Sequence, residues 1–174
     1  MRTAGILLPI QSIARSDAPG AHREACIRAI DALATCGVGI WQILPLNPPD
    51  FVGSPYASPS AFAMDPELLH GLAGDIRDPS ERVLGAWLET SGWADSWALF
   101  RILKSIDQRS WVKWGLWADP SNRDIDHLRS GNEEHYWREI RIQWKLEQAM
   151  KSIETHAREN GVLILGDIPL YVAH

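Results

Sequence analysis

The stretch that decides the fold is Gly39-Ile40-Trp41-Gln42-Ile43-Leu44-Pro45-Leu46-Asn47-Pro48. Its first six residues are almost all apolar and include β-branched and aromatic side chains, which predicts a short buried strand. Because proline cannot donate a hydrogen bond to a sheet, the strand should end near Leu44. A loop rich in Pro, Ser and Gly follows, and it contains Tyr56. A buried strand that leads into a rigid loop is how α/β barrels build active sites.

The preceding residues complete a strand–helix–strand pattern. Gly5–Leu8 is an apolar run that a proline ends, and residues 22–36 carry apolar side chains at helical spacing. Gly37 then supplies the left-handed residue that stops a helix. Two strands joined by a helix within the first 45 residues predict a parallel pair. The apolar strands and striped helices together predict an α/β sheet with both faces covered.

The part of the chain after these two strands is predicted to be mainly helical. Residues 67–129 are short helical segments broken by Gly, Pro and Asp, without a convincing strand. Trp111, Trp114 and Trp117 recur every third residue and could line one helix face, either to pack a small helical section or to form a platform for sugars. Residues 132–159 then predict a helix of about 40 Å, with Asn132 as its N-cap. A third buried strand, Val162–Leu165, follows.

Composition narrows the classes of function. The 174 residues suffice for a domain with a core, and the net charge of −5 argues against a nucleic-acid partner. The sequence shows neither an apolar run that suits a bilayer nor a signal-peptide pattern, so we expect no membrane partner and a cytoplasmic location. Cys26 and Cys36 lie on or beside one apolar helix stripe and are interpreted as buried free thiols. Nine tryptophans leave carbohydrate open as a ligand class.

Two side chains at expected strand ends could carry chemistry, because ligands of such sheets bind there. Tyr56 lies among prolines that hold its loop rigid, and its flat face and hydroxyl suit a sugar ring. Alternatively, it only closes the mouth of the barrel. Asp167 follows the third strand, where a carboxylate can bind substrate hydroxyls or act as acid, base or nucleophile. Alternatively, it caps its own turn.

The sequence lacks the motifs of several other kinds of site. The histidines show no metal-ligand spacing and are expected at the surface or at caps; they are His22, His70, His127, His135, His156 and His174. There is no glycine-rich phosphate loop and no serine nucleophile elbow. Retaining glycoside chemistry needs two carboxylates about 5 to 5.5 Å apart, and only Asp167 can be placed at a strand end.

The central motifs resemble a known family. Residues 41–48, Ser54-Pro55-Tyr56 and residues 60–63 resemble the N-terminal signature of 4-α-glucanotransferases, also called amylomaltases or disproportionating enzymes. Gly5–Pro9 resembles the first strand of that family. The helix that contains Trp144, together with residues 166–172, resembles the segment that reaches its third strand. The likeness extends over nearly the whole chain.

The resemblance implies an incomplete (β/α)₈ TIM-type barrel: its first three parallel strands, with a helical insertion between strands two and three. Residues 1–66 would form the first βαβ unit and the active-site rim loop. Residues 67–130 would form the insertion, and residues 131–174 the long helix, third strand and exit loop of one partial domain.

The resemblance also implies an activity. The family transfers α-1,4-glucan segments between maltodextrins by a retaining double displacement, without a metal or organic cofactor. Ser54 and Tyr56 match positions that contact the donor sugar, and Asp167 matches a structural or near-site aspartate, so these three are the candidate substrate-binding residues. The catalytic carboxylates belong to later family segments, so none lies in this chain and it should be inactive alone. The alternatives are a non-catalytic maltodextrin-binding fragment, or a remnant that needs another chain or segment to complete its barrel.

Overall fold

The computed structural model describes residues 3–14 and 16–172. The strands are β1 (Ala4–Leu7), β2 (Val38–Gln42), β3 (Ala57–Ser58), β4 (Leu163–Leu165) and β5 (Tyr171–Val172). The α-helices are α1 (Ala21–Thr35), α2 (Leu69–Ala73), α3 (Glu81–Thr90), α4 (Trp93–Ile106), α5 (Asn122–Gly131) and α6 (Glu133–Glu159). Short 3₁₀ helices are η1 (Ile10–Ser12), η2 (Pro66–Leu68), η3 (Trp111–Lys113) and η4 (Gly115–Ala118).

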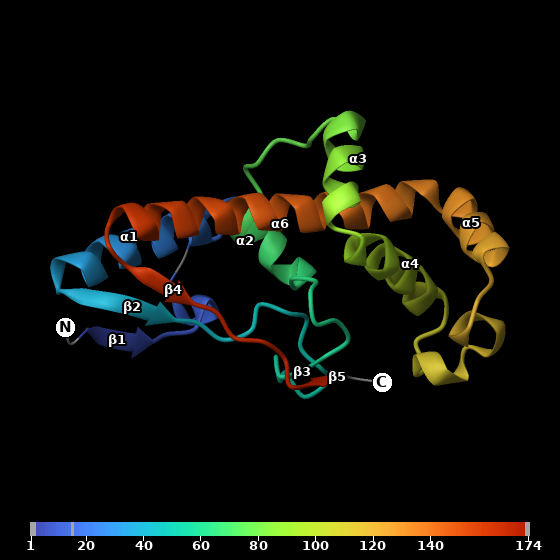
Figure 1. Cartoon of the computed structure of the whole chain (residues 1–174), viewed down its shortest axis with the longest axis horizontal. Coiled ribbons are helices and arrows are strands. Elements are labelled where there is room, and N and C mark those ends of the chain that lie inside the picture. Colours follow the sequence, from blue (N-terminus) through green and yellow to red (C-terminus); the bar gives the residue numbers. More distant parts are fainter. Residues whose placement is uncertain (1–2, 15, 173–174) are drawn as a thin grey trace.

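Three strands form a parallel sheet in the order β1-β2-β4 (Figure 1). The fold is therefore α/β, and the three predicted strands are confirmed to within two residues. Gly37 and Gly161 follow α1 and α6 with φ of +72° and +73°, the left-handed conformation that lets the chain leave a helix and enter the next strand. The indole Nε1 of Trp41 donates to Leu8 O at 2.7 Å and ties the first two strands together.

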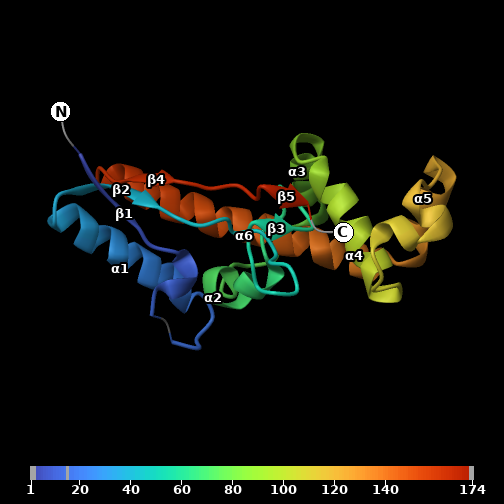
Figure 2. The same cartoon turned by 90° about the horizontal axis from the view of Figure 1, so that it is seen from below.

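The two faces of this sheet differ. Register places Trp41 beside Ile164, and both pack in the core against the helices. Figure 1 shows α1 and α6 on the same side of the three strands, and Figure 2 shows these elements from below. On the opposite face, Leu7, Leu163 and Leu165 are 55%, 65% and 52% exposed. The prediction that both faces are covered is wrong for the described residues, because α1, α2 and α6 all pack on one face.

Helix α6 joins two hydrophobic cores along the length of the molecule (Figure 1). Its C-terminal half contributes Leu146 and Ile153 to the core beneath the sheet, and its N-terminal half contributes Tyr136 and Ile140 to a core with α3, α4 and α5. Asn132 is its N-cap as predicted, but the side-chain amide donates to Leu128 O at 2.9 Å. In the described part of the chain, no helix combines the length and apolarity that crossing a bilayer would require.

The three regularly spaced tryptophans do not share one helix as expected: Trp111 lies on η3, Trp117 on η4, and Trp114 between the two. Gly115, with φ of +61°, separates the two short helices. Trp111, Trp114 and Trp117 nevertheless line one apolar pocket with residues of α4 and α5. Trp114 is buried and its Nε1 donates to Asp107 O at 3.0 Å, so packing accounts for this residue.

Two smaller expectations need correction. Cys26 is a buried free thiol as predicted, but Cys36 is exposed because it follows the last turn of α1. His22 is 1% exposed rather than superficial, and its Nε2 lies 2.6 Å from Ile10 O. It faces inward since it shares the buried stripe of α1 with Cys26 and Ile30. His174 lies outside the described residues.

Candidate functional site

A closed loop of residues 47–64 follows β2 and is held at its ends. Asp65 N donates to Leu46 O at 2.7 Å, which closes the loop. The Asn47 amide donates to Ser60 O at 3.1 Å and Ala63 O at 3.0 Å, which braces the returning segment. All of these hydrogen bonds are made between groups of the protein itself, so they hold the ends of the loop in place.

The tip of the 47–64 loop is fixed by short-range hydrogen bonds. Asp50 Oδ1 accepts from Val52 N at 3.0 Å and Ser54 N at 2.8 Å. Ser54 Oγ in turn accepts from Tyr56 N at 3.3 Å. Together with the local prolines, these bonds hold the backbone that presents the Tyr56 ring.

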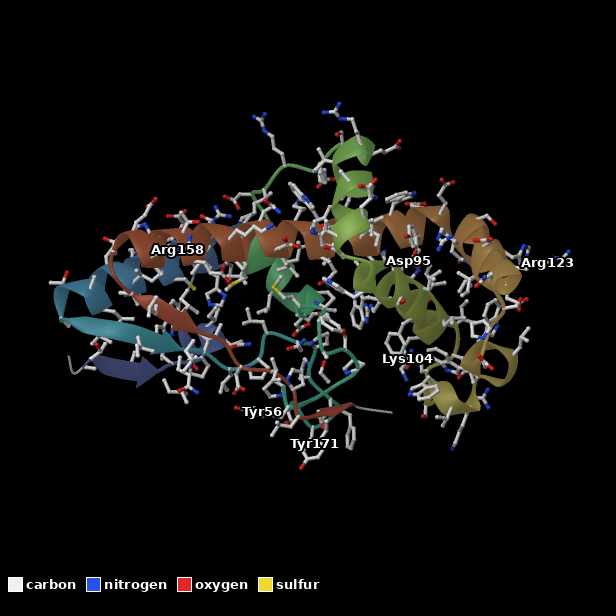
Figure 3. All side chains as sticks on the ribbon, in the orientation of Figure 1. Tyr56, Asp95, Lys104, Arg123, Arg158 and Tyr171 are labelled. Atoms are coloured by element: carbon white, nitrogen blue, oxygen red, sulfur yellow. The ribbon has the colours of Figure 1, made fainter. Side chains whose placement is uncertain are left out.

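The predicted residues from two distant segments meet. The Tyr56 hydroxyl donates to Asp167 Oδ2 at 2.9 Å, across 111 positions of sequence. Tyr171 N also donates to Tyr56 O at 3.0 Å, next to the short parallel pair of β3 and β5. Figure 3 shows Tyr56 and Tyr171 together, away from Asp95 and Lys104 on α4. Ser54, Tyr56 and Asp167 thus come together beyond the carboxyl ends of β2 and β4.

The hydrogen bond to Asp167 sets the chemistry of Tyr56. It raises the pKa of the Tyr56 hydroxyl above its ordinary value, so the phenol stays protonated at neutral pH. The Tyr56 hydroxyl already donates its hydrogen bond to Asp167, but its oxygen can still accept a hydrogen bond from a ligand hydroxyl. Asp167 Oδ1 accepts from Ile168 N at 2.9 Å, so the predicted turn-capping role is also present. The carboxylate both caps its turn and orients Tyr56.

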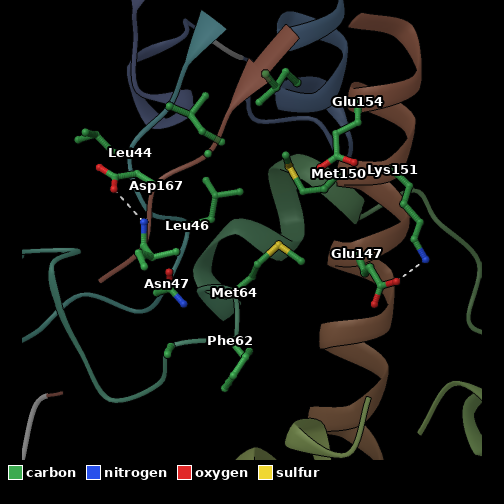
Figure 4. A pocket seen from close by; sticks show the side chains of 15 residues that line it. Leu44, Leu46, Asn47, Phe62, Met64, Glu147, Met150, Lys151, Glu154 and Asp167 are labelled. Atoms are coloured by element: carbon green, nitrogen blue, oxygen red, sulfur yellow. Dashed lines mark hydrogen bonds and ion pairs between the residues drawn. The ribbon is translucent and has the colours of Figure 1, made fainter. Parts of the chain in front are cut away.

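Asp167 also lines a cavity of about 370 Å³, whose lining includes neither Ser54 nor Tyr56 (Figure 4). Asp167 lies on its strand side, and Glu147, Lys151 and Glu154 project from α6 on the opposite wall. Glu147 accepts a 2.6 Å hydrogen bond from Trp87 Nε1 and pairs with Lys151, so this carboxylate is already engaged. The remaining walls are largely apolar side chains, including Leu44, Leu46, Phe62, Met64 and Met150. The arrangement suits a ligand with both apolar faces and hydroxyl groups.

Over residues 3–14 and 16–172, no group of three or more His, Cys, Asp or Glu side chains is placed to hold a metal ion.

Comparison with known proteins gives one family over almost the full chain. The sequence pattern of the 4-alpha-glucanotransferases matches residues 8–73 and 73–174. The chain belongs to the 4-alpha-glucanotransferase family. The 4-alpha-glucanotransferase of Aquifex aeolicus is 27% identical over 217 aligned positions, which cover 100% of this chain and 44% of that protein. The chloroplastic/amyloplastic enzyme DPE1 of Arabidopsis thaliana is 26% identical, with 99% and 38% covered.

Solved structures share the fold. Amylomaltase from Streptococcus agalactiae, solved in complex with acarbose, superposes with a TM-score of 0.84 at 20% identity, covering 99% of this chain and 44% of that one. Amylomaltase from Corynebacterium glutamicum gives 0.63 at 14% identity, covering 97% and 30%. The chain therefore spans less than half the length of these 4-alpha-glucanotransferase relatives.

Sequence reasoning missed the residues that hold the site of this family member in place. Asn47 lies inside the motif that was recognised, but its bonds to the returning loop depend on the folded chain. Gln143 bonds the backbone of Met64 from α6. A signal for Gln143 exists in the sequence, since it is a polar residue three positions after Ile140 on the buried stripe of a helix.

Proposed function

We propose that this chain is the N-terminal part of a 4-alpha-glucanotransferase that moves α-1,4-glucan segments between maltodextrins by a retaining double displacement. The observation that supports it most is the 2.9 Å hydrogen bond between Tyr56 and Asp167. It joins the loops that leave two neighbouring parallel strands, which is where α/β folds bind ligands. Acarbose in the Streptococcus agalactiae amylomaltase is consistent with a maltodextrin partner.

Ser54, Tyr56 and Asp167 have complementary roles in this proposal. The Tyr56 ring lies against the apolar face of a donor glucose unit, and its oxygen accepts a hydrogen bond from a sugar hydroxyl. Asp167 fixes the direction of the Tyr56 hydroxyl, and Ser54 fixes its backbone. Preorganisation of this kind lowers the entropy cost of placing the sugar for reaction.

The carboxylates that break and remake the glycosidic bond lie outside this chain in the proposal. Asp167 is engaged by Tyr56 and Ile168, and Asp50 by amides of its own loop, so the proposal gives neither the role of nucleophile or acid. Of the two glutamates in the cavity, Glu147 is engaged by Trp87 and Lys151, and Glu154 projects from α6 and not from a strand end. A retaining mechanism requires two such groups about 5 to 5.5 Å apart. The isolated chain is therefore inactive, and the complete enzyme needs no metal or organic cofactor.

The proposal also explains why one face of the β1-β2-β4 sheet is exposed. Leu7, Leu163 and Leu165 face the interior of a (β/α)₈ barrel of which β1, β2 and β4 are the first three strands. Further strands, supplied by the same polypeptide or by another chain, cover this face and pair with the open strand edges. The enzyme acts in the cytoplasm.

Two assays test the proposal. Incubation of the 174 residues with maltotriose should release no glucose and form no longer maltodextrins; products at the rate of a whole family enzyme would overturn the predicted inactivity. Maltoheptaose should quench tryptophan fluorescence, and Tyr56→Ala should abolish the quenching. Leu116→Ala, which removes an exposed apolar side chain on η4, is the control and should bind as the unaltered chain does. No response at millimolar sugar would contradict the binding site.

A further inference from the structure

Gln143 makes a two-point contact with the 47–64 loop. Its side chain is 0% exposed on α6. Oε1 accepts from Met64 N at 2.9 Å, and Nε2 donates to Met64 O at 2.9 Å. A side-chain amide that pairs with both polar groups of one residue fixes that residue in distance and in rotation, which a single hydrogen bond does not.

The contact lies where the loop returns to the body of the protein. Met64 precedes Asp65, whose N–H closes the loop on Leu46 O at 2.7 Å. It also follows Ala63, whose O accepts from Asn47 at 3.0 Å. A shift of Met64 would therefore disturb both hydrogen bonds that hold the ends of the loop.

The chemistry of the position shows that packing alone does not account for a glutamine. Gln143 lies between Ile140 and Leu146 on the buried stripe of α6, where an apolar side chain would pack without desolvating an amide. The amide has both of its groups satisfied, and both bonds go to Met64. Its orientation is thus directed at the loop and not at the neighbouring helices.

We propose that Gln143 is a positioning residue, which fixes the 47–64 loop from α6 so that Tyr56 meets Asp167. The inference rests on the proposed function only in that the positioned site is taken to be the donor-sugar site. Gln143 itself touches no substrate. It acts through Met64 and the closed loop on the ring that does.

The direct test follows the Tyr56 hydroxyl with fluorine NMR. The full chain is labelled with 3-fluorotyrosine, and its three tyrosine resonances are assigned by substitution with Phe. Asp167→Ala gives the position of the Tyr56 resonance without its acceptor. In Gln143→Met, which keeps the side-chain length without the amide, the Tyr56 resonance should move toward that position. Exchange of the Met64 amide should become about tenfold faster.

A control separates positioning from general weakening of α6. Ile153→Ala damages the core on the same helix ten residues away and should leave the Tyr56 resonance in place. Gln143→Ala should behave like Gln143→Met, and the Met variant decides if the Ala variant does not fold. A Tyr56 resonance that stays at its original position in folded Gln143→Met, or that moves equally in Ile153→Ala, would overturn the proposal.

A binding measurement distinguishes this inference from the proposed function. Gln143→Met should weaken maltoheptaose binding about tenfold, as expected if Tyr56 loses its fixed position. If the unaltered chain binds no maltoheptaose, the glucan function fails while the fluorine signal still decides the role of Gln143. If the unaltered chain binds and Gln143→Met binds equally well, the positioning role fails.

Discussion

Leu163→Lys should be tolerated by the isolated chain although it places a charge in an apolar strand. Leu163 lies on β4, on the face of the sheet that no described helix covers, and is 65% exposed. Full burial of a leucine side chain stabilises a protein by about 1.5 to 3 kcal/mol, and about a third of that applies here. The substitution should therefore cost about 0.5 to 1 kcal/mol.

The comparison variant is Ile153→Ala in the core beneath the same sheet. Ile153 is 0% exposed, and its truncation should cost about 2 to 5 kcal/mol because it also leaves a cavity. Urea unfolding followed by tryptophan fluorescence and by circular dichroism at 222 nm gives both free energies of unfolding. Measurements at two protein concentrations show whether self-association contributes.

A cost for Leu163→Lys as large as that for Ile153→Ala would refute the reasoning, since the face would then be covered in the isolated chain. In a completed barrel the same lysine would place an unpaired charge in the interior and cost several kcal/mol. The small cost is therefore specific to the uncovered sheet.

Three further predictions concern single side chains. Asp167→Asn should lower the pKa of Tyr56 toward the ordinary tyrosine value, because it removes the charged acceptor that raises this pKa. The stabilisation from this hydrogen bond is present below pH 10 and is lost as the pH rises through the raised pKa. Absorbance titration of both variants, with Tyr56→Phe as the reference, measures the shift. Under native conditions at pH 8, Ellman's reagent should modify exposed Cys36 alone, since burial raises the pKa of the Cys26 thiol to about 12; two thiols reacting at equal rates would contradict this. Tyr136→Phe should destabilise the chain by about 1 kcal/mol, because it removes a partly buried 2.7 Å hydrogen bond to Asp95 on α4. A lower urea midpoint would report the loss, and an unchanged midpoint would contradict it.

Local structure was predictable where glycine, proline and apolar spacing act together. Gly37 and Gly161 mark the ends of α1 and α6, and the strands that follow them were placed to within two residues. The strand-end rule also points to Tyr56 and Asp167, which hydrogen-bond to each other in the folded chain. These features depend on short-range sequence and on a general property of parallel sheets.

Long-range detail was not predictable from one sequence. β3 and β5 have two residues each, too few to show a period, and they pair only because the folded chain brings them together. The contact of Gln143 with Met64 is likewise set by how α6 crosses the loop. The apolar residues of β4 predict burial on both faces, whereas the described helices cover one. That difference is the physical basis for proposing further strands.

The most direct test of the account is an NMR titration of the isotope-labelled chain with maltoheptaose. Saturable shifts centred on Ser54, Tyr56 and Asp167 are predicted, because these residues form the proposed donor-sugar site at the ends of β2 and β4. Absence of shifts at millimolar sugar, or shifts confined to residues 93–117, would contradict it.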